Sequence, residues 1–247
     1  MDTELAEARR LARKIARSTG TPRFYAEKRK EVESSRRMFQ SSHLVMECLN
    51  ILNERGDVIG HGVGHSRKVA IDVGALTLVE YTPIRQRSEV RRMVLLAHVA
   101  GILHDLKRLE KDHAQVSAGE AGMLLTRFDL TAREVQAITG AIRNHEAFRE
   151  AEILEDPIAQ FLSDALYDAD KFRWGPDNFT EMLWDMVEYR KASLDALLAR
   201  FLKGMEGIKR IRETFRTHTG KIYGPDFIDR GVEIGMKFYT DIRQSRS

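Results

Sequence analysis

The dipeptide His104-Asp105 follows the longest apolar run of the sequence, which extends from Met93 to Leu103. An imidazole next to a carboxylate is costly to bury unless both groups are paired with other charges or bind a metal ion. Further histidines and aspartates occur on both sides of this pair: His65, His113, His145, Asp168 and Asp170. Because neutral imidazole and carboxylate are good ligands for first-row transition metals, the sequence predicts a metal site built around His104-Asp105.

Three of these histidines end an apolar stripe at helical spacing. The stripes are His65 with Val69, Val73 and Leu76, His104 with Val90, Val94, Ala97 and Gly101, and His145 with Val135, Ile138 and Ile142. A single histidine in such a position is more often an ordinary core residue than a ligand. Three stripe ends that converge would instead form a polar pocket inside an apolar bundle, where metal sites of helical bundles are built.

The residue types allow one or two metal ions per chain. A first ion could be held by His65, His104, Asp105 and Asp170 and keep positions for water. Asp105 has two oxygens and could bridge to a second ion held by His113 and His145. Two ions about 3.5–4 Å apart generate a hydroxide nucleophile at neutral pH and clamp a phosphate group. The absence of a thiolate favours iron, manganese, cobalt or zinc in a reactive site over a cysteine-rich structural zinc site.

Residues 60–175 resemble the HD-domain metal-dependent phosphohydrolases. Within them His65, Leu103-His-Asp105 and Ala169-Asp170 match the four residues of the defining motif of that family. His113 and His145 resemble the additional ligands of the branch with binuclear sites. The helical phase does not separate Asp168 from Asp170, and the family pattern, in which the aspartate follows a small residue, selects Asp170.

The resemblance also suggests catalytic residues. His61 precedes His65 by four residues, an arrangement also found in the cyclic-nucleotide phosphodiesterase relatives, where the first histidine donates a proton. Lys107 follows the His-Asp pair, as a lysine often does in the family, and is expected to meet phosphate oxygens together with Lys68 and Arg108. Each of these three bases taken alone is more often a surface charge. Asp105 would act in catalysis through the ions that it holds.

The activity that the resemblance implies is hydrolysis of a phosphomonoester or phosphodiester, with a small phosphorylated molecule such as a nucleotide as substrate and a metal-activated water as nucleophile. Two alternatives stay open. Some HD-fold di-iron oxygenases use the same order of six ligands to cleave C–C or C–P bonds with O₂. A non-catalytic module that senses a nucleotide would keep the fold, although a pure scaffold has no need for so complete a ligand set.

The periodicity predicts an all-α protein, with an HD-domain-like helical bundle and helical extensions on both sides. Proline is scarce, with five residues among 247, and apolar residues recur at intervals of three and four. We expect one domain over 1–247, with a metal-binding core at about 60–175, a basic N-terminal extension at about 1–40 and a C-terminal helical region at about 179–247. The helices expected after the core cover 179–203, 205–217 and 226–242, the last beginning at Gly224-Pro-Asp226.

Composition limits the environment and the partners. The single cysteine, Cys48, excludes an intrachain disulfide and suits a reducing compartment. No apolar stretch approaches the roughly 20 residues that span a bilayer, and the charged N-terminus has no signal-peptide character, so a cytoplasmic protein without a membrane partner is expected. Residues 1–37 carry eleven Lys and Arg against six Asp and Glu. These charges are interspersed, which favours a solvated helix face over a nucleic-acid interface. Aromatic residues of the C-terminal region could serve the core or a homodimer contact.

Overall fold

The computed structural model describes residues 3–54 and 62–246, and within these ranges it contains helices, turns and loops but no strand. The prediction of an all-α chain is therefore confirmed. The helices are α1 (Thr3–Thr19), α2 (Arg23–Glu27), α3 (Arg29–Ser41), α4 (His43–Glu54), α5 (Val63–Tyr81), α6 (Arg87–Leu103), α7 (His113–Leu125), α8 (Ala132–Arg143), α9 (Pro157–Phe172), the π-helix η1 (Asn178–Met182), α10 (Leu183–Tyr189), α11 (Leu194–Ile211) and α12 (His218–Gln244). None of these helices has the length and apolar character that crossing a membrane requires.

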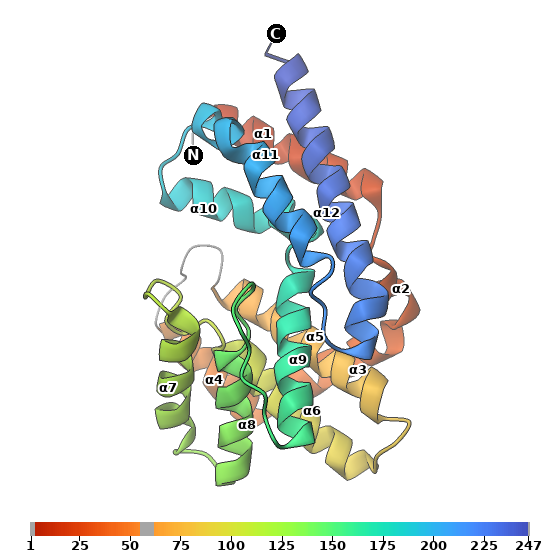
Figure 1. Cartoon of the computed structure of the whole chain (residues 1–247), viewed down its shortest axis with the longest axis vertical. Helices are drawn as coiled ribbons and strands as arrows, with labels where there is room; N and C mark the ends of the chain where they lie inside the picture. Colours follow the sequence, from red (N-terminus) through yellow and green to blue (C-terminus); the bar gives the residue numbers. More distant parts are fainter. Residues whose placement is uncertain (1–2, 55–61, 247) are drawn as a thin grey trace.

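The helices form two groups that share one apolar core (Figure 1). Helices α3 to α9 form the lower part of the view, and α1, α10 and α11 lie above them around the upper half of α12. The lower half of α12 continues down beside α9. Aromatic side chains join α9 to α12 there, because the rings of Phe172 and Phe227 stack with their centroids 4.1 Å apart. The core therefore continues from the group that carries the histidines into the C-terminal helices.

Helices α5 and α6 approach each other closely because small residues face each other between them. A Cβ atom on Gly101 would lie only 2.5 Å from the Cα atom of Ala70, so only glycine allows this backbone separation. Gly74 likewise leaves room for the ring of His98, whose Nε2 atom lies 2.9 Å from Ser35 Oγ. This packing brings the first turn of α5, which carries His65, next to the C-terminal end of α6.

Local sequence signals fix the beginnings of α8 and α9. The hydroxyl of Thr131 accepts from the backbone N–H of Glu134, and the Glu134 carboxylate accepts from the backbone N–H of Thr131, so the predicted capping box is present. The Asp156 side chain accepts from the N–H of Ile158 ahead of Pro157, the first residue of α9. These two starts set the directions in which α8 and α9 deliver His145 and Asp170.

The expected helix over 179–203 is wrong, since the chain breaks between α10 and α11. Lys191 adopts a left-handed backbone conformation with φ of 49°. Ser193 then caps α11 by accepting from the N–H of Ala196. Ahead of the break, five residues form the π-helix η1, whose turn is wider than that of an α-helix. The apolar periodicity continues across all three elements, so periodicity alone could not reveal the ends.

The expected start of the last helix at Gly224-Pro-Asp226 is also wrong. Helix α12 begins at His218, and Pro225 lies inside it. A proline in a helix forgoes one backbone hydrogen bond, so other contacts must hold this segment. One such contact is the close packing of Gly224 against the ring of Phe215, where a Cβ atom on residue 224 would lie only 2.3 Å from the ring. The glycine and proline that suggested a turn therefore belong to a helix packed tightly against Phe215.

The true start of α12 depends on a buried carboxylate of α9. Asp168 accepts hydrogen bonds from the backbone N–H groups of Arg216 and Thr217 and from the Thr217 hydroxyl, all at 2.7–2.8 Å. Burial raises the pKa of Asp168 to about 7, and the three bonds act against this shift by favouring the carboxylate. Asp168 is thus a structural link between α9 and α12.

We expect Asp168→Ala to destabilise the fold by about 2–4 kcal/mol, because it leaves buried donors at the start of α12 without an acceptor. Urea denaturation of this variant and of Asp164→Ala, a partly buried aspartate one turn earlier on α9, measures the effect. Equal midpoints for the two variants and the unmodified protein would contradict this role of Asp168.

Candidate metal centre

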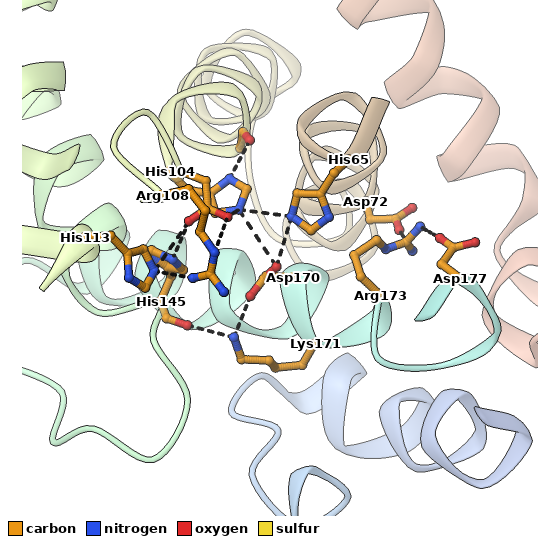
Figure 2. Close-up of polar contacts among 12 residues, drawn as sticks. His65, Asp72, His104, Arg108, His113, His145, Asp170, Lys171, Arg173 and Asp177 are labelled. Atoms are coloured by element: carbon orange, nitrogen blue, oxygen red, sulfur yellow. Dashed lines mark hydrogen bonds and ion pairs between the residues drawn. The ribbon is translucent and has the colours of Figure 1, made fainter. Parts of the chain in front are cut away.

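The six residues predicted as metal ligands are all buried. Figure 2 shows His65, His104, His113, His145 and Asp170 close together, and the contacts of Asp105 with three of these histidines place it among them. Five different elements or element ends deliver them, since His65 lies on the first turn of α5, His104 and Asp105 follow α6, and His113 begins α7. His145 follows α8 by two residues, and Asp170 lies on the last turn of α9. The stripes that pointed each histidine inward in the sequence thus converge in space.

One half of the cluster consists of His65, His104 and Asp170. The Nε2 atoms of the two histidines are 3.2 Å apart, and Asp170 Oδ1 lies 3.3 Å from His65 Nε2 and 3.8 Å from His104 Nε2. Ligand atoms about 2.1 Å from an ion are roughly 3–3.5 Å apart in tetrahedral coordination. Two of the three separations lie in this range, and the third, 3.8 Å between Asp170 Oδ1 and His104 Nε2, is slightly longer, so a small shift of one side chain would place three ligand atoms around one ion.

Asp105 joins this half of the cluster to a second one. Its Oδ2 atom lies 3.5 Å from His104 Nε2. Its Oδ1 atom lies 3.3 Å from His145 Nε2 and 3.5 Å from His113 Nε2. Since one oxygen of the carboxylate faces His104 and the other faces His145 and His113, Asp105 has the geometry of a bridging ligand.

Backbone hydrogen bonds fix which ring nitrogen faces the cluster. His104 Nδ1 donates to the carbonyl of Gly101 at 2.9 Å, and His145 Nδ1 donates to the carbonyl of Ile142 at 2.6 Å. With the proton on Nδ1, the Nε2 atom of each ring has a free lone pair, and this lone pair points towards the other possible metal ligands. Metal-binding histidines are commonly oriented in this way.

The protonation states also suit metal binding, which requires neutral imidazoles and ionised carboxylates. Burial lowers the pKa of His104 to about 3 and keeps its ring neutral. Burial acts to raise the pKa of Asp105, but His104 and His145 outweigh it and hold that pKa well below its usual value. Burial opposes ionisation of Asp170 as well, and Lys171 and His65 likewise hold its pKa well below the ordinary range. The donor set therefore fits a divalent transition metal.

Two bases contact the ligand residues in ways that the sequence did not predict: Lys171 was given no role in the site, and Arg108 was expected to meet phosphate oxygens rather than a histidine. Lys171 Nζ donates to Asp170 Oδ2 at 2.5 Å and to the backbone carbonyl of His145 at 3.0 Å, which leaves Asp170 Oδ1 facing the imidazoles. Arg108 Nη1 lies 2.6 Å from His113 Nε2. The position of Lys171 next to Asp170 was the one available signal, and it gave no direction for the side chain.

Among the remaining candidates, Asp168 and Lys107 make contacts with other residues. Asp168 faces α12 and takes no part in the cluster. Lys107 Nζ is 3.6 Å from Glu110 Oε1. The neighbouring residue, Arg108, contacts the predicted ligand His113 instead. His61 lies outside the residues that the structure describes.

A pocket of about 420 Å³ opens beside His65. Its wall is formed by the first turns of α5, by the turn after α9 and by the η1–α10 segment, with these residues: Gly62, Gly64, His65, Lys68, Arg173, Asp177, Glu181, Met182, Asp185, Glu188 and Tyr189. Lys68 Nζ lies 2.5 Å from Glu181 Oε2 and 3.4 Å from Asp177 Oδ1. The pocket is large enough for part of a small molecule to reach the His65 side of the cluster.

A buried ionic network supports the same pocket. The Arg173 guanidinium donates to Asp72 on α5, to the hydroxyl of Tyr25 on α2 and to Asp177. Arg173 and Asp72 are almost completely buried. Removal of one partner of such a buried ion pair strongly destabilises the folded protein, because the other charge is left without compensation. The network ties α5 to the end of α9, which are the helices that carry His65 and Asp170.

Comparisons of the chain with protein-family models, with curated proteins and with solved structures find no match. The resemblance to HD-domain proteins therefore rests on the residues of the cluster and their order in the sequence.

We expect purified protein to carry at least one transition-metal ion per chain and His104→Ala and Asp105→Ala to lose it, because these two residues lie at the centre of the donor set. Elemental analysis after metal-replete expression measures the content, with His43→Ala, an exposed histidine of α4, as the matched control. Removal of the ion by a chelator should lower the melting temperature, since an ion bound only by the folded state stabilises it. A folded, metal-free wild-type protein would contradict the assignment.

Proposed function

We propose that this chain is a metal-dependent phosphohydrolase of the HD-domain type. The observation that carries the proposal is the position of Asp105, whose Oδ2 faces His104 while its Oδ1 faces His145 and His113. A carboxylate placed in this way suits a pair of ions that share one ligand. Iron, manganese, cobalt or zinc would each suit the mixed nitrogen and oxygen donors.

Each of the two ions would be held by its own set of residues, with one residue shared. His65, His104 and Asp170 would hold the first, His113 and His145 the second, and Asp105 both. Such ions, when bound, supply a hydroxide nucleophile at neutral pH and neutralise the charge of a phosphate group. The chain itself orients the donors, through the backbone carbonyls bonded to His104 and His145 and through the lysine bonded to Asp170.

The substrate proposed is a small phosphate ester, for which a nucleotide is the leading candidate. Its phosphate would lie over the cluster, and the rest would extend into the pocket beside His65. Lys68 lies three residues after His65 on α5 and lines this pocket. Its ammonium group is held by carboxylates and could exchange them for a phosphate oxygen, as a lysine commonly does in phosphate sites. His61 would supply a proton to the leaving group under this proposal, and this role stays a prediction.

An oxygenase with an iron pair would use the same ligands, so the donor set alone does not separate the two reactions. Oxygen dependence does, because hydrolysis consumes water and needs no O₂. A sensing module would bind a nucleotide without any turnover. These three functions therefore give different results in a single assay series.

We expect the metal-loaded protein to release inorganic phosphate from at least one member of a panel of nucleotides and aryl phosphates, at the same rate with and without O₂. His65→Ala should reduce this release to background because it removes a donor of the first ion, whereas His43→Ala should leave it unchanged. Colorimetric phosphate detection in an anaerobic chamber makes the measurement. Turnover that requires O₂ would favour the oxygenase, and nucleotide binding without turnover would favour the sensor.

A further inference from the structure

Arg108 reaches the half of the cluster that faces away from His65. It lies in the turn after α6, where its backbone N–H donates to the Asp105 carbonyl at 3.1 Å. Its side chain turns back, so that Nη1 lies 2.6 Å from His113 Nε2 and Nε lies 3.9 Å from Asp105 Oδ2. Figure 2 shows the guanidinium between His113 and Asp170, pointing into the cluster.

This contact excludes an ion on His113. A guanidinium has donors but no acceptor and stays protonated in proteins, so Arg108 must donate to the lone pair of His113 Nε2. That lone pair cannot accept a hydrogen bond and coordinate an ion at the same time. A second ion held by His113, His145 and Asp105 therefore requires Arg108 to leave its position in the structure.

The displaced guanidinium would remain close to the site. Its backbone is held by the turn at Asp105, and its side chain is about one-third exposed, so it can swing towards solvent without unfolding its surroundings. In the same turn Glu110 and Lys111 are exposed, and Lys107 Nζ lies 3.6 Å from Glu110 Oε1. A guanidinium released in this way is free to take an anionic partner, and the paired oxygens of a phosphate match its fork of donors in a bidentate manner.

We propose that Arg108 alternates between His113 and a phosphate anion, and that it thereby couples binding of the second metal ion to binding of phosphate. The inference rests on the two-ion function proposed above. While Arg108 bonds to His113, it competes with the second ion and weakens its binding. An anion that engages Arg108 removes the competitor, and by reciprocity the second ion strengthens anion binding by the same factor.

The coupling is tested by titrating the metal-free protein with Mn²⁺ and counting bound ions by electron paramagnetic resonance, with and without inorganic phosphate. The wild-type protein should bind one ion tightly and a second one weakly. Phosphate should tighten the second ion by a factor of about 5–150, the usual range of such couplings.

Arg108→Met removes the donors and the charge while keeping most of the side-chain length. It should bind the second ion more tightly than the wild type in the absence of phosphate, and phosphate should give it little further tightening. Lys111→Met removes one positive charge from the same turn at an exposed position and should behave like the wild type. The first ion should bind equally in all three proteins.

The outcomes separate the inference from the function on which it rests. Two ions with unchanged second-ion affinity in Arg108→Met, or phosphate coupling that persists in that variant, would overturn the role of Arg108 and leave the two-ion site intact. Saturation of the wild type at one ion would overturn the two-ion function and the inference together. An equal effect of Lys111→Met would show a general charge effect and would also overturn the inference.

Discussion

The carboxylate of Asp105 is ionised in a buried position, and the residues around it are arranged so that this negative charge can be stabilised. An isolated buried carboxylate is strongly disfavoured and persists when cations, hydrogen-bond donors or metal ions compensate it. In this chain the guanidinium of Arg108 lies 3.9 Å from Asp105 Oδ2, and imidazole nitrogens of His104, His113 and His145 surround the carboxylate. Because His104 and His145 direct lone pairs at it, a metal ion held between them would supply the compensating charge. Asp170 meets the same requirement through Lys171 on its outer oxygen and His65 on its inner one.

Helix α9 shows how the fold holds these charges in place. Three residues near its C-terminal end make different contacts. Asp168 accepts a hydrogen bond from the start of α12, and Asp170 faces the cluster. Lys171 donates to both Asp170 and the backbone carbonyl of His145. Arg173, just beyond the helix, is bonded to Asp72 on α5. Because α9 is bonded on several sides, the Asp170 oxygen that faces the cluster is restricted to one orientation.

The sequence predicts the helical class and the convergence of the six ligands, because a helix displays its period of 3.6 residues directly in the spacing of apolar positions. The sequence does not predict that Asp168 bonds to the start of α12. Asp168 and Asp170 lie on opposite sides of the apolar stripe of α9, so the helical phase alone does not show which of them faces the cluster. The contact of Arg108 with His113 escapes prediction for a related reason. Arg108 lies in a turn, where no periodicity gives the direction of a side chain.

The C-terminal region shows a second limit of sequence reasoning. The breaks at Lys191 and Ser193 and the start of α12 depend on capping bonds and on the buried Asp168, which lies 49 positions from Thr217 in the chain. Local signals pointed to Gly224-Pro-Asp226 instead, although that segment packs within a helix against Phe215. Contacts between distant segments outweighed local preference at this position.

A crystal structure of the Mn²⁺-loaded protein, with anomalous diffraction data, tests most directly whether the cluster holds two ions that share Asp105. We expect two anomalous peaks about 3.5–4 Å apart, one beside His65, His104 and Asp170 and one beside His113 and His145, with an Asp105 oxygen on each. Peaks located away from these residues, or a fully loaded crystal with a cluster that binds no ion, would contradict the account.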